Sequence, residues 1–244
     1  MKNKDTEPLR LRWLDPAQPD EAFPPINQAL KEPNGLLALG GDLSSTRLLN
    51  AYRQGIFPWY GHGEPILWWS PDPRCVFDPA SVHVSRSLRR ILNKKDHRVT
   101  FDRAFETVIR ACAELRPGQD GTWLTPAMQT AYTLLHHQGW AHSVEVWRND
   151  VLIGGIYGVA IGGAFFGESM FSRAPNASKI ALVSLARQLA GWNFTLLDAQ
   201  VGSAHLYTLG AVDLPRREFL QRLSGALALP GRSQAWGSRM NPAD

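Results

Sequence analysis

The sequence predicts an α+β protein, in which a small N-terminal domain precedes a larger domain of α/β type. Three observations support this fold class. The pattern changes to a period of two from residue 141, over residues 143–148, and with the apolar segments 151–159 and 164–168 it predicts an antiparallel meander of strands. A helix with apolar residues at helical spacing follows, with Asn176 as its N-cap and Gly191 as its stop. A further strand is expected at residues 194–201.

The composition indicates a folded protein of the cytoplasm. The chain has 244 residues, 44% of them hydrophobic, which is enough for a sizeable core. Its two cysteines, Cys75 and Cys112, lie far apart, so neither a disulfide framework nor a thiolate zinc site is expected. Residues 1–7 lack the apolar stretch of a secretory signal. The uncharged run at 151–166 is shorter than the roughly 20 residues of a membrane span and predicts two core strands instead.

The N-terminal domain is expected to cover residues 1–95, and the second domain residues 96–244. The first thirty residues are rich in Pro, Asp and Glu and predict a loosely structured lead-in. Ser44 or Ser45 is expected to cap a helix that ends near Gly55. We therefore expect a mainly helical N-terminal part. The many Trp and Pro residues at 55–74 suggest a rigid, aromatic-walled surface, but we expect most of these aromatic side chains to form the core of a small domain.

A strongly basic segment lies at residues 86–98, where six basic residues stand against one acid and give a net charge of +5. On a helix, Arg86, Arg90 and Lys94 share one face at i, i+4 spacing. Such a face is either an ordinary solvated surface or a patch that binds phosphates. The residues alone leave both interpretations open.

Further helices are indicated along the second domain. Asp102 is expected to cap one helix, and Thr125 caps another that stops at Gly139. A last amphipathic helix begins at Pro215. The tail after Pro230 is expected to be mobile.

Three polar residues at the ends of the expected strands are candidates for chemistry. Glu168 ends an aromatic strand, where an unpaired carboxylate is costly, so it needs a partner. That partner is Lys179 or Arg173 in a structural role, or a substrate in a functional one. Asp198 and Gln200 are two residues apart on a strand, so their side chains should face the same side and act on one ligand.

The element order of the second domain is similar to the N-acetyltransferase-like (GNAT) fold. In that fold, a glycine-rich turn before the central helix holds the pyrophosphate of coenzyme A. The corresponding turn here, residues 172–177, has no glycine, and Pro175 lacks an amide. Acetyl-CoA is therefore not the expected acyl donor. A serine hydrolase also fits poorly, because residues 167–171 begin like a GxSxG elbow but end in Phe171.

Six segments, collinear within residues 23–223, carry a resemblance to a known family. They are EPNGLLALGGDL at 32–43, GIFPWY at 55–60, LWWSPDPR at 67–74, GESMFS at 167–172, NASK at 176–179 and DAQ at 198–200. Through them the chain resembles the bacterial leucyl/phenylalanyl-tRNA-protein transferases. Several long motifs in the same order are far more specific than any single short pattern.

The resemblance implies an enzyme that moves leucine or phenylalanine, and methionine less readily, from aminoacyl-tRNA to the α-amine of proteins that begin with Arg or Lys. The product carries a destabilising N-terminus that leads to protein degradation. The resemblance implies a GNAT-like catalytic part without a cofactor. It also favours the phosphate-binding interpretation of the basic segment, as a tRNA surface made of Arg86, Arg89, Arg90, Lys94 and Lys95. No membrane association is expected, and we expect a monomer.

The resemblance also assigns site residues. It implies an apolar pocket for the aminoacyl side chain, drawn from Trp59, Trp123, Ile156, Phe165, Met170 and Leu185. Ile156 and Leu185 stand where the family pattern has Met and Phe, which leaves the preference between leucine and phenylalanine open. Catalysis falls to Asp198, Gln200 and Glu168.

Chemistry narrows these catalytic roles. A carboxamide is a very weak base, so we expect Gln200 to orient the amine, and Asp198 to favour the incoming cation and to be a candidate proton acceptor. For Glu168 the resemblance favours a contact with a substrate without saying which. Two alternatives remain: a CoA-dependent GNAT acetyltransferase and a non-catalytic RNA-binding protein.

Overall fold

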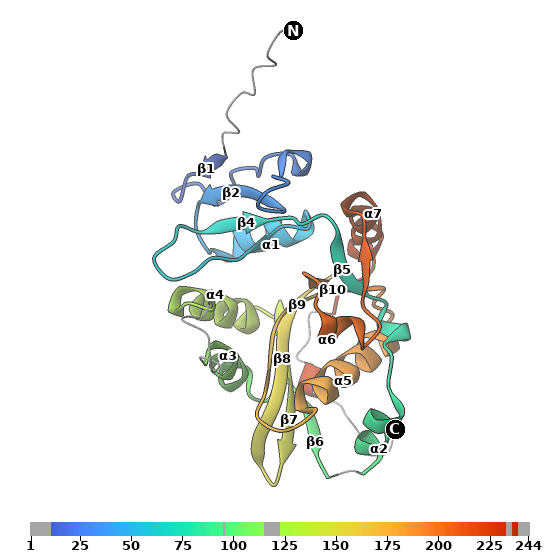
Figure 1. The fold of residues 1–244 in the computed structure, drawn as a ribbon. Coiled ribbons are helices and arrows are strands. Elements are labelled where there is room, and N and C mark those ends of the chain that lie inside the picture. Colours follow the sequence, from blue (N-terminus) through green and yellow to red (C-terminus); the bar gives the residue numbers. More distant parts are fainter. Residues whose placement is uncertain (1–10, 95, 115–122, 233–235, 239–244) are drawn as a thin grey trace, which may run out of the picture.

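Two β-sheets organise the chain in the computed structural model, which describes residues 11–94, 96–114, 123–232 and 236–238 (Figure 1). The smaller sheet has the strand order β1-β2-β4-β3. Its strands are Arg12–Leu14 (β1), Leu36–Gly40 (β2), Phe57–Pro58 (β3) and Leu67–Trp69 (β4). The prediction of a mainly helical N-terminal part is therefore wrong. These strands have two to five residues each, too few for a period of two to stand out in the sequence.

The described part of the N-terminal lead-in is ordered by its contacts, contrary to the expectation of a loose segment. β1 pairs in parallel with β2, and Leu14 is fully buried. The buried guanidinium of Arg47 donates to the carbonyl oxygens of Asp15 and Gln18 at 2.8 and 2.5 Å. Arg47 also donates to the carboxylate of Asp42 at 2.8 Å. The lead-in is thus held by a side chain about thirty positions away, which local composition does not reveal.

The larger sheet contains the predicted meander and has the strand order β11-β5-β10-β9-β8-β7-β6. Its strands are Arg74–Phe77 (β5), Arg98–Phe101 (β6), Ala141–Arg148 (β7), Val151–Ile161 (β8), Ala164–Ser172 (β9), Leu196–Gln200 (β10) and Val212–Leu214 (β11). β7, β8 and β9 form an antiparallel meander, as predicted, and the expected further strand, β10, pairs in parallel with β9. β5 precedes residue 95 in the chain and pairs with β10 and β11. The domain division at residue 95 stays a prediction.

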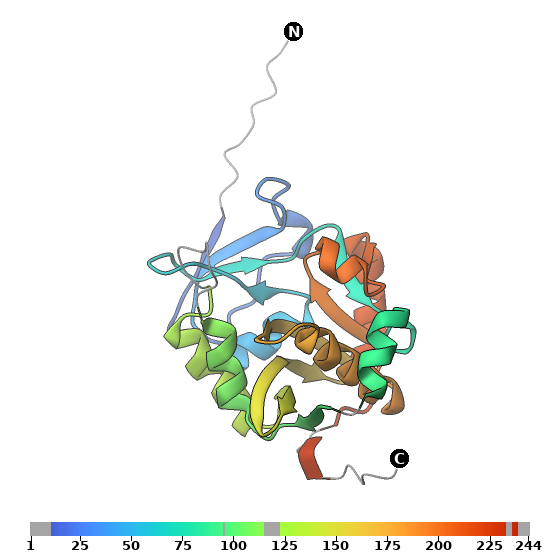
Figure 2. The same ribbon diagram turned by 60° about the horizontal axis from the view of Figure 1, so that its bottom comes forward.

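The helices cover both faces of the larger sheet. The described α-helices are Ser45–Arg53 (α1), Arg86–Asn93 (α2), Phe105–Ala113 (α3), Pro126–His137 (α4), Ala177–Gly191 (α5), Ala204–Tyr207 (α6) and Arg216–Leu227 (α7). Short 3₁₀ turns occur at Ile26–Gln28, Pro79–Ser81 and Trp236–Ser238. α3 and α4 pack on one face and α5 on the other, and α2 lies outside α5 (Figures 1 and 2). None of the described helices is long and apolar enough to span a bilayer.

The predicted helix caps were right in part. The hydroxyls of Ser44 and Thr125 accept from backbone amides of α1 and α4, as predicted. Asn176 precedes α5 as expected, but its backbone is left-handed and its side chain caps nothing. The hydroxyl of Ser172 instead accepts from the amide of Ser178 at 3.3 Å.

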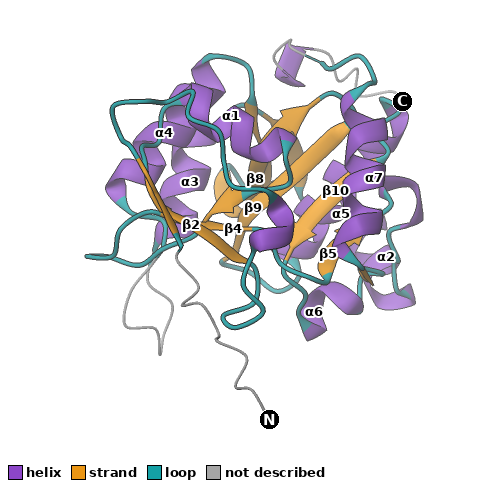
Figure 3. Ribbon diagram, turned by 90° about the horizontal axis from the view of Figure 1, so that it is seen from above, coloured by secondary structure: helices purple, strands orange, loops and turns teal. Residues whose placement is uncertain are grey.

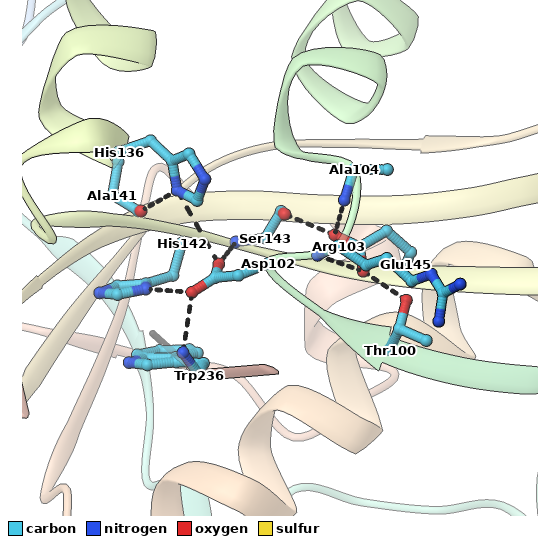
Figure 4. Close-up of polar contacts among 10 residues, drawn as sticks. All are labelled: Thr100, Asp102, Arg103, Ala104, His136, Ala141, His142, Ser143, Glu145 and Trp236. Atoms are coloured by element: carbon cyan, nitrogen blue, oxygen red, sulfur yellow. Dashed lines mark hydrogen bonds and ion pairs between the residues drawn. The ribbon is translucent and has the colours of Figure 1, made fainter. Parts of the chain in front are cut away.

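Asp102 was wrongly expected to cap α3, which begins after Ala104. Its carboxylate joins distant segments instead (Figure 4). One oxygen accepts from the amide of Ser143 at 2.9 Å, and the other bonds Nδ1 of His142 at 2.8 Å and the amide of Trp236 at 3.1 Å. The rings of Trp236 and His142 stack with centroids 4.0 Å apart. The prediction of a mobile tail is thus wrong at Trp236, which is buried.

The site lies where β9 and β10 separate. Their parallel pairing ends at Phe166 and Asp198. Just beyond, β9 bulges against β8 so that Glu168 has no opposite residue, and β10 bulges against β5 at Ala199. Bulges of this kind redirect side chains. Seen from above, β2 and β4 of the smaller sheet lie close to β8 and β9 in the projection (Figure 3), and the ring of Tyr52 in α1 contacts that of Phe166.

Candidate active site

Glu168 is the centre of a hydrogen-bonded group contributed by three separate parts of the chain. The bulge in β9 turns its half-buried side chain toward α4 and the end of β10. One carboxylate oxygen accepts from the hydroxyl of Tyr132 at 2.7 Å. The other accepts from Nε2 of Gln200, also at 2.7 Å. These partners replace the predicted Lys179 or Arg173, and Arg173 pairs with Glu114 instead.

The surroundings of Glu168 raise the pKa of its carboxyl to about 7. Burial is the largest cause, because removing water penalises the charged form. The negative charge of Asp198 raises it further, whereas the hydrogen bonds from Tyr132, Tyr52 and Gln200 stabilise the carboxylate and lower it. Glu168 therefore changes protonation state near neutral pH, as a general acid or base requires.

Two tyrosines support Glu168 and were not among the predicted site residues. The hydroxyls of Tyr52 and Tyr132 lie 2.5 Å apart, and both side chains are fully buried. Burial and the charge of Glu168 raise the pKa of both tyrosines well above the usual value, so they remain neutral donors. Tyr132 lies on the buried face of α4. Nothing local could reveal its partner eighty positions earlier in the chain.

Asp198 and Gln200 have different partners, although the sequence placed them on one side of a strand. The bulge at Ala199 interrupts the alternation, and Gln200 has a left-handed backbone with φ of 64°. Its side chain reaches Glu168, and its amide donates to Oδ1 of Asp198 at 2.9 Å. Asp198 is 0% exposed and forms a two-pronged ion pair with Arg74 at 2.8 and 2.7 Å. The carboxylate of Asp198, although this residue lines the larger cavity described below, therefore already accepts from Arg74 and from the amide of Gln200.

An apolar cavity of about 290 Å³ opens beside Glu168. Trp123, Ile156 and Met170 of the predicted pocket line it. The further apolar lining comes from Phe77, Leu182, Leu197, Ala199 and Leu206. Its polar lining residues are Glu168, Ser169 and Asp198, so a bound side chain and a reacting polar group can be held together.

A second cavity, of about 180 Å³, reaches Glu168 from the side of the smaller sheet. Trp59, which is 47% exposed, and Gln200 line it with residues from β3 and β10. The two cavities share Trp123, Glu168 and Ala199. Two substrates could therefore meet at Glu168, one from each cavity.

Two predicted pocket residues line neither of these cavities. Phe165 faces the α5 side of the sheet, where its ring lies 5.6 Å from that of Trp236. Leu185 is fully buried in α5. Both belong to the core behind the larger cavity, because their positions in β9 and α5 direct them inward.

The predicted basic helix forms as α2. Arg86, Arg89, Arg90 and Lys94 are exposed, and within the described residues none of them takes part in an ion pair. Lys95 lies outside the described residues. The segment before α2 is tied to the end of α6 by a 2.9 Å hydrogen bond from the amide of His83 to the carbonyl of Leu209. Since α6 contributes Leu206 to the larger cavity, the basic surface begins close to the site.

In the described ranges, no group of three or more His, Cys, Asp or Glu side chains is arranged to hold a metal ion. The polar groups present are a carboxylate with a pKa near neutrality, a carboxamide and two neutral hydroxyls. This set can orient an amine and exchange protons with it. The apolar cavity can hold the side chain of the partner with which the amine reacts.

Comparison with known proteins gives consistent matches. A family model described as "Leucyl/phenylalanyl-tRNA protein transferase" matches residues 76–224, and one for the N-terminal domain of the same proteins matches residues 41–72. Curated relatives named leucyl/phenylalanyl-tRNA–protein transferase include that of Nitrosomonas europaea, 58% identical over 89% of this chain and 92% of the relative. That of Azotobacter vinelandii is 58% identical over 86% of this chain and 92% of the relative.

Similarity to solved structures is distant. A functionally unknown conserved protein from Staphylococcus epidermidis matches with a TM-score of 0.40 and 14% identity, over 87% of this chain and 90% of that one. A GCN5-related N-acetyltransferase from Kribbella flavida matches with a TM-score of 0.35 and 12% identity, over 69% of this chain and 59% of that one. Similarity at this level supports no inference about activity.

Proposed function

This chain belongs to the leucyl/phenylalanyl-tRNA–protein transferase family and is an aminoacyltransferase, and we propose that its acceptors are proteins that begin with Arg or Lys. It transfers leucine or phenylalanine, and methionine less readily, from aminoacyl-tRNA to the acceptor's α-amine. The observation that carries this proposal is the position of Glu168 where the two cavities meet. The reaction places its donor and acceptor substrates around the same few atoms. The product has the N-terminus of a protein destined for degradation in the cytoplasm.

The larger cavity suits the side chain of the donor amino acid. Its lining, including Ile156, Met170 and Leu182, is apolar, so charged side chains are excluded by the cost of losing water. A pocket of this kind distinguishes one methylene group by only about 1 to 3 kcal/mol. It therefore accepts both leucine and phenylalanine, and it accepts methionine less readily.

The smaller cavity suits the acceptor's first residue. Gln200 and Glu168 line it and provide an amide oxygen and a carboxylate for the α-ammonium group. Trp59 and Trp123 also line it, and an indole face attracts the cationic side chain of Arg or Lys. The negative charge of Glu168 and the indole faces together favour a basic first residue.

The proton chemistry follows from the pKa of Glu168. An α-amine has a pKa of about 7.7 to 8.0, so a carboxylate with a pKa of about 7 can take its proton at little cost. The freed amine attacks the ester carbonyl, the new C–N bond forms, and the C–O bond to the tRNA ribose breaks. The nitrogen loses two protons in all. One ends on the leaving ribose oxygen and the other on solvent, and Glu168 is the group that relays them.

The basic face of α2 suits the tRNA part of the donor. Arg86, Arg89, Arg90 and Lys94 are exposed cations, and the sequence places Lys95 next to them. Contacts of this kind attract phosphates without reading bases and weaken as salt rises. They position the acceptor end of a tRNA toward the larger cavity.

The test is a transfer assay with labelled Phe-tRNA and two peptides that differ only in their first residue, Arg or acetylated Arg. We expect label on the free Arg peptide without added CoA or ATP, and none on the acetylated one, because its amine is blocked. Peptides beginning with Lys and Glu test the acceptor preference. Transfer to the Glu peptide at the rate of the Arg peptide contradicts the proposed acceptors. A chain that moves acetyl groups from acetyl-CoA, and no amino acid from tRNA, is instead an acetyltransferase.

A further inference from the structure

Arg74, at the start of β5, is buried and makes more hydrogen bonds than an arginine in a surface ion pair usually does. It is 1% exposed. Its Nε and Nη2 donate to the two oxygens of Asp198 at 2.8 and 2.7 Å, and its Nη1 donates to the carbonyl of Gly55 at 3.1 Å. All three guanidinium nitrogens therefore have partners, and the planar fork matches the carboxylate in the geometry that arginine provides and lysine does not.

Two aromatic rings pack against this guanidinium. The ring centroid of Phe57 in β3 lies 4.7 Å from its central carbon, and that of Phe219 in α7 lies 4.6 Å away. Arg74 thus connects a strand of the smaller sheet, the C-terminal helix and β10. An arginine that contacts two rings and makes three hydrogen bonds has few alternative positions, and so has the carboxylate that it binds.

Asp198 links Arg74 to Gln200 through hydrogen bonds, so the fixed position of Arg74 also restricts Gln200. Its Oδ1 accepts from both Arg74 and the amide of Gln200, and its Oδ2 is taken by Arg74. Gln200 has a left-handed backbone, which non-glycine residues rarely adopt unless their surroundings impose it. The amide of Gln200 is held by Asp198 while its Nε2 reaches Glu168 at 2.7 Å. A continuous path of hydrogen bonds runs from Arg74 to the candidate proton acceptor.

We propose that Arg74 is a positioning residue, which through Asp198 fixes the backbone of Gln200 and thereby the contact of Gln200 with Glu168. Asp198 is then an acceptor that anchors Gln200, and it exchanges no proton with the substrate. Asp198 lines the larger cavity, but its side chain is 0% exposed and its two oxygens already accept from three donors. This inference rests on the proposed function and adds Arg74, which lines neither of the two cavities.

The first test compares Arg74→Lys and Arg74→Gln with Arg47→Lys. Arg47 is the matched control, since it is equally buried and paired with Asp42 but belongs to the small sheet region. In the transfer assay we expect both Arg74 variants to lower kcat by about 10- to 100-fold with KM for Phe-tRNA within about twofold, because misplacing a reacting group mainly costs kcat. Arg47→Lys should lose comparable thermal stability and keep its kcat. Folded Arg74 variants with the parental kcat overturn the proposal.

The second test separates anchoring from proton transfer at Asp198. Asp198→Asn keeps an oxygen that can accept from Gln200, whereas Asp198→Ala keeps none. We expect the Asn variant to retain at least about tenfold more kcat than the Ala variant, as conservative rescue of a positioning role requires. Equal loss in both, with folding intact, makes Asp198 a proton acceptor and overturns the proposal. This comparison also decides the matter if the Arg74 variants do not fold.

A measurement that does not depend on enzyme activity distinguishes this inference from the proposed function. The side-chain amide resonances of Gln200 in ¹H–¹⁵N spectra report its contact with Glu168. They should move in Arg74→Gln and stay in place in Arg47→Lys. If the parent enzyme transfers no amino acid, only the proposed function is contradicted. If the Gln200 resonances do not move in Arg74→Gln, only the positioning role is contradicted.

Discussion

Glu168 and Gln200 meet through a 2.7 Å hydrogen bond between Oε1 and Nε2, and each lies at a β-bulge in neighbouring strands. In a regular sheet, β9 and β10 would continue to pair beyond Phe166 and Asp198. The two bulges instead turn both side chains into the gap between the strands, which opens into the two cavities. The interruption of the sheet is therefore what creates the site.

Replacing Glu168 by Gln should remove the acidic limb of the pH–rate profile. In the parent, kcat for transfer should rise as pH passes through about 7, because the carboxyl must be deprotonated to take the amine's proton. Glu168→Gln should lower kcat by about 100-fold or more and make the residual rate follow only the amine. Initial rates at saturating Phe-tRNA between pH 5.5 and 9 measure this. If the Gln variant kept an acidic limb of the pH–rate profile near pH 7, a group other than Glu168 would be responsible for that limb.

The same carboxyl should make stability depend on pH. The pKa of Glu168 is raised in the folded protein from 4.5 to about 7, so the folded state holds this proton more tightly than the unfolded chain does. Its stabilising contribution is complete below about 4.5 and is lost as pH rises to about 7. Urea titrations of the parent and Glu168→Gln at pH 5 and 7.5 measure it. The parent should lose more stability over this interval than the variant, and equal losses would refute the assignment.

Removing the hydroxyl of Tyr132 should shift the acidic limb to higher pH. The hydroxyl donates to Glu168 at 2.7 Å and lowers its pKa, so Tyr132→Phe should raise that pKa and move the limb upward. Tyr157→Phe is the control, since Tyr157 is also fully buried and its hydroxyl has no hydrogen-bond partner among the described residues. An unshifted limb in Tyr132→Phe, or an equal shift in both variants, would contradict the role of this hydrogen bond.

Neutralising the basic face of α2 should weaken the binding of aminoacyl-tRNA. The triple variant Arg86→Gln, Arg89→Gln, Arg90→Gln should raise KM for Phe-tRNA and leave KM for the peptide unchanged. The slope of log affinity against log salt should fall by about 0.7 to 0.9 for each phosphate that the variant no longer binds. Arg222→Gln is the control, as an exposed arginine of α7 paired with Glu218. An unchanged salt slope in the triple variant would mean that α2 is only a solvated surface.

Truncating Trp236 should reduce stability and spare catalysis. Its ring stacks on His142 and contacts Trp192 at 5.0 Å, so Trp236→Ala should lower the free energy of unfolding by about 3 to 5 kcal/mol. Trp13, which is 62% exposed, is the control, and Trp13→Ala should cost less than about 0.5 kcal/mol. Denaturant unfolding measures both, with kcat assayed well below the transition. A Trp236→Ala protein as stable as the parent would show that this tail segment is not an anchor.

Local signals in the sequence predicted much of the fold. Thr125 and Ser44 cap their helices because a hydroxyl three residues before a free amide can satisfy it wherever the helix lies. The meander follows from the period of two, and the turn at Asn149 and Asp150 from their tolerance of a left-handed backbone, which both adopt. The motifs also singled out Glu168 and Gln200, because polar residues at the ends of buried strands stand out.

Tertiary structure decided which groups these residues meet. Glu168 has Tyr132 and Gln200 as partners, Asp198 has Arg74, and Asp102 has His142 and Trp236, all at least thirty positions away in the chain. Residue type and spacing show that a buried carboxylate needs a donor. Which donor fills that need depends on how the sheets and helices pack and on where a strand bulges. Local conformational preferences act over a few residues, whereas the cost of burying an unpaired charge is relieved by whichever side chain the completed fold brings near.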